Sequence, residues 1–203
     1  MIPFALTSLA SAATFALKPF EATSETTDLA LTATVVQDNN ILSLSYLLTG
    51  DLSKVVIPKI GEAAQREDRL WEKTCFEFFI KMGTGRSAAY WEFNLSPNGG
   101  WNVFSLPGYR QKLKEERAFL QLPFSTQVSP ETLRLEISVD IGVLRQQALV
   151  GRGQPLHMGV SAVILLLPHQ ESFWAIAHPA AQADFHHPDS FVITLAEITP
   201  STS

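Results

Sequence analysis

The chain has 203 residues, of which 46% are hydrophobic and 17% charged, a composition typical of one globular domain with a sizeable core. Its formal net charge of −5 argues against nucleic acid and anionic membranes as main partners, because both require basic surfaces. The single cysteine, Cys75, excludes an intrachain disulfide and a thiol metal cluster, and its place in a strand-like run indicates a buried thiol.

The N-terminal segment is apolar, but no Lys or Arg precedes its apolar part as in a secretion signal. Cleavage after Ala13 would also fall at the start of a strand-like run, residues 15–20. We therefore expect a leader or flexible segment over residues 1–13, a single domain over 14–203 and a cytoplasmic location. A secreted or periplasmic location would follow if residues 1–13 act as a signal segment.

Apolar and polar residues alternate along most of the chain, which is the pattern of half-buried antiparallel strands. The clearest alternations lie at 29–35, 42–48 and 133–139, and a hairpin loop at 37–40 joins the first two. Further strands are expected at 15–20, 74–82, 90–95, 101–106, 156–167, 172–178 and 190–195. The segment 156–167 is apolar on both faces towards its end, and its β-branched content and flanking prolines favour a covered strand over a buried helix.

Helix signals are few. Residues 140–147 fit one or two helical turns with Asp140 as the N-cap, and residues 109–119 fit either a helix or a solvated loop. Because the crossover helices of a parallel sheet are missing, the pattern predicts an all-β fold. We expect a two-sheet antiparallel β-sandwich, jelly-roll or immunoglobulin-like, with one or two short helices in loops.

Polar side chains share one face of two successive strands, while the apolar side chains take the other face. The polar set comprises Glu77, Tyr90, Glu92 and Asn94. If the apolar sets point inwards, this set lies on an outer, exposed face. Like charges on neighbouring strands are unfavourable unless a ligand, a cation or a basic side chain lies between them. Lys81, Arg110 or the hydroxyls of a sugar could take that place.

A sugar suits such a face, because its CH surfaces stack on aromatic rings and its hydroxyls bond carboxylate, amide and guanidinium groups. Trp71 and Trp101 are the first stacking candidates, the second of them at the rim after a glycine pair. Trp174 is a further candidate, but the alternation of its strand does not decide whether its side chain points to the core or to the outer face. Trp91 is expected in the core, because it shares a face with Phe93.

The C-terminal stretch 182–191 concentrates four polar residues that could bind a metal, namely Asp184, His186, His187 and Asp189. Adjacent histidines in an extended segment point to opposite faces, whereas zinc requires convergent ligands. We therefore expect a solvated or locally hydrogen-bonded loop and assign no cofactor, although an oxygen site for Ca²⁺ stays open. The chain has no nucleophile elbow, phosphate-binding glycine loop or dinucleotide fingerprint.

The blocks LWEKTCFEFFIKMG and YWEFNLSPNGGWNVFSLPGYR resemble DOMON-like proteins related to type 9 carbohydrate-binding modules. The residues that carry the resemblance are Trp71, Glu77, Phe79, Tyr90, Trp91, Glu92, Phe93, Pro97, Gly99 or Gly100, and Trp101. It implies a β-sandwich that binds sugars or, in other branches of the family, haem. It also implies that Trp71 is one wall of a sugar site, that Glu77 is an acceptor and that Trp174 is a second wall.

The leading hypothesis is a non-catalytic domain that binds a carbohydrate or another small polar ligand. Its candidate ligand-binding residues are Trp71, Glu77, Tyr90, Glu92, Asn94, Trp101, Arg110 and Trp174. The alternatives are a glycoside hydrolase with Glu77 and Glu92 as its carboxylate pair and a structural or protein-interaction domain with no small ligand. A haem-binding domain is a further alternative, with axial ligands drawn from Met82, Met158, His157 and His178. The oligomeric state stays open.

Overall fold

A computed structural model describes residues 11–61, 64–83, 85–147 and 155–195. Its strands are β1 (Ser11–Pro19), β2 (Leu29–Asp38), β3 (Ile41–Gly50), β4 (Gln65–Arg66), β5 (Cys75–Met82), β6 (Tyr90–Leu95), β7 (Gly100–Leu106), β8 (Lys114–Glu115), β9 (Phe124–Val128), β10 (Thr132–Asp140), β11 (Leu156–Leu166), β12 (Gln170–Ala175) and β13 (Ile193–Leu195). The helical elements are the 3₁₀ helices η1 (Leu52–Lys54), η2 (Leu70–Glu72) and η3 (Pro188–Ser190) and the α-helix α1 (Gly142–Gln147). None of the helices described is long and apolar enough to cross a membrane.

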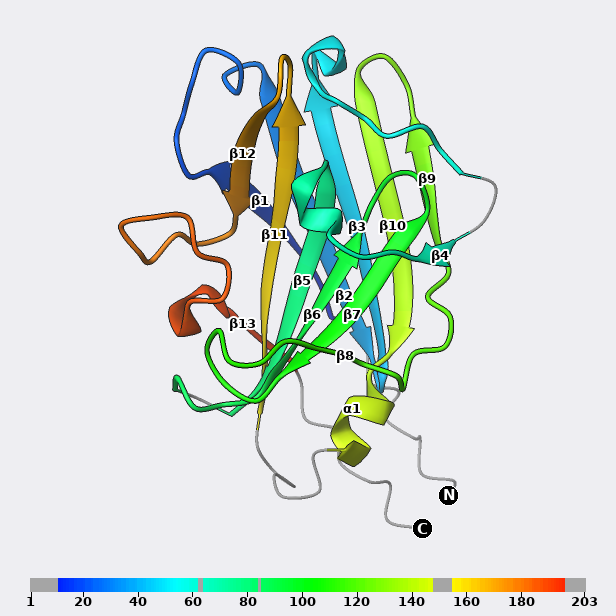
Figure 1. Cartoon of the computed structure of the whole chain (residues 1–203), viewed down its shortest axis with the longest axis vertical. Coiled ribbons are helices and arrows are strands. Elements are labelled where there is room, and N and C mark those ends of the chain that lie inside the picture. Colours follow the sequence, from blue (N-terminus) through cyan, green and yellow to red (C-terminus); the bar gives the residue numbers. More distant parts are fainter. Residues whose placement is uncertain (1–10, 62–63, 84, 148–154, 196–203) are drawn as a thin grey trace, which may run out of the picture.

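The strands form one continuous curled sheet, a half-barrel (Figure 1), in the order β4-β7-β6-β5-β11-β12-β1-β2-β3-β10-β9. Strand β1 joins its two halves, because Ser11 to Leu17 pair with β2 while Lys18 and Pro19 pair with β12. The open half comprises β1, β2, β3, β10 and β9, and the covered half comprises β12, β11, β5, β6, β7 and β4. Nearly all the pairs are antiparallel; the short β4 runs parallel to β7.

The core lies between the two halves, which face each other across it (Figure 1). Tyr46 of β3 contacts the Phe76 ring of β5, with ring centroids 5.1 Å apart, and its hydroxyl donates to the Glu77 carbonyl oxygen at 2.7 Å. Phe78 and Phe93 stack on neighbouring strands with centroids 4.3 Å apart. Burying such aromatic side chains is the main stabilising contribution to a two-layer fold of this size.

The all-β class predicted from the alternation is confirmed, and most of the predicted strands are present. The prediction of two separate sheets describes the structure less well, because β1 belongs to both halves. Helix α1 follows Asp140, whose side chain accepts a hydrogen bond from the Gly142 backbone N–H at 2.7 Å. The mixed-charge stretch 109–119 is a loop that contributes only the short strand β8. Residues 1–10 of the predicted leader lie outside the described residues, and residues 11–13 are part of β1.

Candidate functional site

The polar side chains of β5 and β6 share one face, as the alternation predicts, but that face is buried. Glu77, Glu92 and Asn94 are exposed by only 3%, 5% and 0%. The sequence-based expectation of an exposed outer face is therefore wrong. Three distant segments, here called the covering layer, lie over this face: helix η2, the loop 107–113 and the segment 176–192.

Under the covering layer lies a cavity of about 310 Å³, a size typical of small-ligand sites. Strands β5 and β6 form its floor, and β11 and β12 extend it on one side. Its lining residues are Trp71, Glu77, Glu92, Arg110, Leu113, Val163, Glu171, Phe173, Ala183, Phe185 and His186. A second cavity of about 290 Å³ adjoins it and shares the residues Glu171, Phe173 and Ala183.

Glu77 has a buried carboxyl group with an unused oxygen. Its Oε1 atom has no hydrogen-bond partner among the described residues, and the same holds for the Oγ atom of Ser161, the residue paired with it on β11. Burial, and next the nearby Glu92, raise the pKa of Glu77 well above its usual range. A buried polar atom without a partner is costly, so a ligand group that reaches Oε1 would be strongly favoured.

Glu92 forms the second carboxyl group of the floor, on the strand next to Glu77. Its Oε1 accepts a hydrogen bond from Asn94 Nδ2 at 2.8 Å, and its Oε2 lies 4.0 Å from His186 Nε2. Burial raises the pKa of Glu92 to about 7, although the Asn94 bond and the Arg110 charge act in the opposite direction. At neutral pH the two neighbouring carboxyl groups therefore retain at least one proton between them.

His186 closes the cavity above Glu92 as a neutral ring. Burial, with a contribution from the Arg110 charge, lowers the pKa of His186 to about 4. Its Nδ1 lies 2.8 Å from the Tyr90 hydroxyl, which also accepts the Arg110 backbone N–H at 3.2 Å. The Tyr90 hydroxyl and His186 Nδ1 share one hydrogen bond, and the tautomer of His186 sets which of the two groups donates.

Asp184 anchors the covering layer. It accepts hydrogen bonds from the Tyr109 hydroxyl at 2.6 Å, from the Arg110 guanidinium at 2.9 Å and from the His186 backbone N–H at 3.1 Å. These bonds join the loop 107–113 to the C-terminal segment. The hydrogen-bonded loop expected from this sequence is thus present, and its polar groups hold the covering layer in place over the sheet.

The basic side chains proposed to separate the acidic residues have different positions. Arg110 lines the cavity, with its charge paired to Asp184. Lys81 instead donates to the Pro188 carbonyl oxygen at 2.8 Å, and its ammonium lies 4.5 Å from the centre of the Phe191 ring. Lys81 therefore fastens the covering layer and does not lie between the two glutamates.

Of the four tryptophans, only Trp71 lines the cavity. Trp101 and Trp174 are core residues exposed by 3% and 2%, so the expectation that Trp101 lies at a rim is wrong. Trp91 is in the core, as predicted, and its Nε1 donates to Glu116 Oε2 at 3.1 Å. Tyr90, expected to face outwards, is buried under the covering layer.

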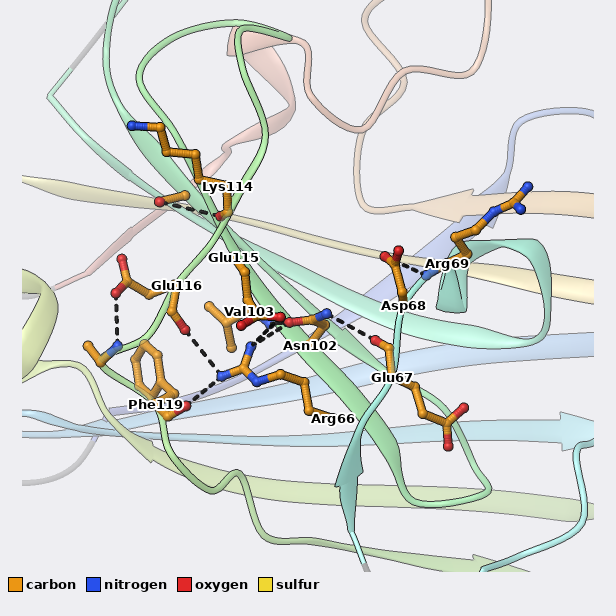
Figure 2. Close-up of polar contacts among 12 residues, drawn as sticks. Arg66, Glu67, Asp68, Arg69, Asn102, Val103, Lys114, Glu115, Glu116 and Phe119 are labelled. Atoms are coloured by element: carbon orange, nitrogen blue, oxygen red, sulfur yellow. Dashed lines mark hydrogen bonds and ion pairs between the residues drawn. The ribbon is translucent and has the colours of Figure 1, made fainter.

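Arg66 explains why Trp101 is unavailable to a ligand. Its guanidinium carbon lies 4.2 Å from the centre of the Trp101 ring, which it covers. Figure 2 shows the same guanidinium donating to the Asn102 side chain and to the carbonyl oxygens of Glu116 and Phe119. The hairpin end that carries Trp101 is thus fixed as part of the fold.

Sequence reasoning missed several cavity residues because they come from other parts of the chain. Phe173 alternates with Trp174 along β12, so one ring faces the cavity and the other the core. Phe185 and Glu171 also line the cavity, and nothing local in the sequence marks them. The sequence marks His186 only as a metal-ligand candidate, because its hydrogen bond to Tyr90 depends on long-range packing.

The metal and haem alternatives fit this arrangement poorly. Within the part of the chain that the structure describes, no group of three or more His, Cys, Asp or Glu side chains could hold a metal ion. Met158 lies in the core and Met82 packs against it, on the face of the sheet opposite to the cavity. Cys75 is buried, as its place in a strand-like run indicates, and burial raises the pKa of its thiol well above the ordinary value.

Neither a family model nor a curated protein matches the sequence. Among solved structures, the fold is similar to that of "a putative carbohydrate-binding protein from Bacteroides uniformis ATCC 8492", with a TM-score of 0.62. The match covers 88% of this chain and 84% of that protein, at 14% sequence identity. This likeness shows a shared fold.

Proposed function

We propose that this protein is a non-catalytic, DOMON-like domain that binds a carbohydrate or a related small polar ligand in the cavity under the covering layer. The observation that carries the proposal is the combination of aromatic walls with an unpartnered, buried carboxyl oxygen on Glu77. Trp71, Phe173 and Phe185 supply apolar ring surfaces, and the floor supplies hydrogen-bonding groups. A polyhydroxylated ring needs both kinds of surface.

The resemblance to type 9 carbohydrate-binding modules and the carbohydrate-binding description of the structural neighbour support the same ligand class. The resemblance differs from the structure in the position of one wall of the site. The resemblance suggests a site with Trp71 and Trp174 as two walls, whereas Trp174 is in the core. We assign the second wall to Phe173, the neighbour of Trp174 on the opposite face of β12.

Calorimetric titration with a panel of mono- and disaccharides tests this proposal. We expect at least one sugar to bind, and Trp71→Ala to weaken that binding by about tenfold or more through loss of ring stacking. Leu120→Ala serves as the control, because Leu120 is an exposed apolar residue outside the cavity. A folded sample that binds no sugar in a broad panel would refute the proposal.

A glycoside hydrolase is the second candidate, because two carboxyl groups on neighbouring strands share one cavity. Such enzymes need one protonated and one ionised carboxyl group, with pKa values pushed apart. Here burial raises the pKa of both Glu77 and Glu92, so neither carboxyl group is held in the ionised form that the nucleophile or base of such an enzyme requires. We expect no release of reducing sugar from a panel of aryl glycosides; turnover that Glu92→Gln abolishes would overturn this expectation.

A further inference from the structure

The charges of the cavity are unbalanced in favour of acidic groups. Its lining contains three carboxyl groups, those of Glu77, Glu92 and Glu171. The one guanidinium of the lining, Arg110, is already paired with Asp184 at 2.9 Å. His186 adds no positive charge near neutral pH, because burial lowers its pKa to about 4. An anionic ligand would therefore meet uncompensated carboxyl groups, whereas a cationic ligand would complement them.

The two carboxyl groups of the floor are arranged so that one cation can lie between them. Glu77 is paired with Asn94 in the strand register and Glu92 with Phe79, which makes the two glutamates diagonal neighbours on one face. Such neighbours have backbones about 7–8 Å apart, so long side chains can converge on a shared group. Glu77 Oε1 is buried without a partner, and Glu92 Oε2 has His186 only at 4.0 Å.

The walls of the cavity also suit a cation. Phe173 and Phe185 meet edge to face with centroids 6.0 Å apart, and both line the cavity together with Trp71. The faces of aromatic rings attract positive charge, most strongly where water is excluded. Ring walls above a carboxyl floor are a suitable environment for an ammonium group, whose donors would be shared between the two glutamates.

We propose that the ligand of this cavity is an amine-bearing sugar, whose protonated amine lies between Glu77 and Glu92 while its ring stacks on Trp71 and Phe173. This inference rests on the proposed sugar-binding function and adds the chemical class of the ligand. A neutral sugar can satisfy Glu77 Oε1 with a hydroxyl, but it leaves the carboxyl pair protonated. An ammonium group replaces the retained proton.

Binding of an ammonium group therefore releases a proton from the carboxyl pair. The cation lowers the pKa of both carboxyl groups, so the proton held near neutral pH passes to the buffer. The other titratable groups close to the pair are Cys75, Tyr90, Asp184, His186 and Arg110, together with Tyr46 beneath Glu77. None of them changes its charge near pH 7, so the released proton reports on the two glutamates. Glu171, the third carboxyl group of the lining, lies on β12, outside the pair.

Calorimetry with glucosamine, galactosamine, their N-acetyl derivatives and the parent neutral sugars tests this inference at about pH 6, where the amine is protonated. Repeating each titration in two buffers of different ionisation enthalpy measures proton release. We expect the free amines to bind about tenfold or more tightly than the N-acetylated and neutral sugars, with release of about one proton per ligand.

Two variants complete the experiment. Glu77→Gln should remove the proton release and the preference for the amine, so that amine-bearing and neutral sugars bind the variant with affinities within about threefold of each other. Glu136→Gln is the matched control, an exposed glutamate on the outer face of the open half. Equal binding of neutral and amine-bearing sugars without proton release would overturn the inference but leave the proposed function intact. Absence of binding by every sugar would refute the proposed function itself.

Discussion

The outer faces of the two halves of the sheet differ sharply, although the strands of both halves alternate between two kinds of side chain. On the open half, residues of β3 are buried and half-exposed in turn. Polar pairs there face solvent, such as Ser43 and Ser138, whose hydroxyl oxygens lie 2.7 Å apart. On the covered half, every residue of β6 is buried. The difference arises from the covering layer, which excludes solvent from the polar face of β5 and β6.

This difference shows which half of the sheet can hold side chains with altered protonation and unmet hydrogen bonds. A serine or threonine on the open half exchanges hydrogen bonds with water at little cost. A carboxyl group on the covered half loses that water, so its protonation and its bonds depend on the protein around it. The same strand pattern therefore produces an inert surface in one half and a ligand cavity in the other.

The largest expected effect concerns Phe79, which lies on the outer face of the covered half. Its ring contacts the rings of Tyr90, His186 and Phe191, and it is almost fully buried. We expect Phe79→Ala to lower the free energy of unfolding by about 3–5 kcal/mol, measured by denaturant titration. The equivalent outer-face change on the open half, Thr34→Ala, should cost about 0.5 kcal/mol or less. Similar costs at the two sites would contradict the contrast between the halves.

The next effect is a pH dependence. Because burial raises the folded-state pKa of Glu92 from 4.5 to about 7, its protonated form supports folding at low pH. This contribution is full below about pH 4.5 and is lost as the pH rises towards about 7, and Glu77 acts in the same direction. Glu92 alone should make the stability of the wild type relative to Glu77→Gln/Glu92→Gln fall by roughly 3 kcal/mol over that range, and Glu77 should add to this fall.

The contribution of His186 to stability has the opposite pH dependence. Its lowered pKa favours folding at higher pH, and this contribution is lost as the pH falls from about 6.5 to about 4. Taking the difference between wild type and the double variant removes this shared contribution. Unfolding curves at several pH values supply the measurement. A difference that stays flat with pH, or rises with it, would argue against the buried carboxyl pair.

A smaller effect is expected at the anchor of the covering layer. Tyr109→Phe removes the hydrogen bond to Asp184 and should lower the free energy of unfolding by about 1–2 kcal/mol. Hydrogen exchange should become faster in residues 182–190 and stay unchanged in the core strands. Faster exchange throughout the sheet would show that the covering layer and the core unfold together.

The smallest effect is expected on the open half. Ser43→Ala removes the exposed hydroxyl pair with Ser138, and we expect a change within about 0.5 kcal/mol of zero. Thermal unfolding of the variant beside the wild type measures it. If the variant lost 2 kcal/mol or more of its free energy of unfolding, the outer face of the open half would also be covered, for example by a second protein chain.

Local alternation predicted much of the fold. It separated the two faces of β5 and β6 correctly and placed Trp91 in the core, while the N-cap signal of Asp140 located helix α1. These features depend on neighbours in sequence. In the structure Trp101 pairs with Leu95 of β6, on the core face of the sheet. The neighbouring glycine pair suggested a rim instead.

The burial of the polar face could not be predicted in this way. Glu77 and Glu92 were identified as a pair, but whether they face water depends on segments far along the chain. Phe185 and His186 reach the cavity through bonds between Asp184 and the loop 107–113. Such packing carries no local periodic signal, so the sequence indicated the floor of the site and not its walls.

The four indole rings lie in two different environments, so their fluorescence should report on two different events. Trp91, Trp101 and Trp174 are shielded in the core, whereas Trp71 is half-buried beside the cavity. A collisional quencher such as iodide should therefore reach Trp71 first, and a ligand in the cavity should protect it. Trp71→Phe should abolish this protection and leave the emission change on unfolding. The chain thus carries one fluorescent reporter of occupancy and three of folding.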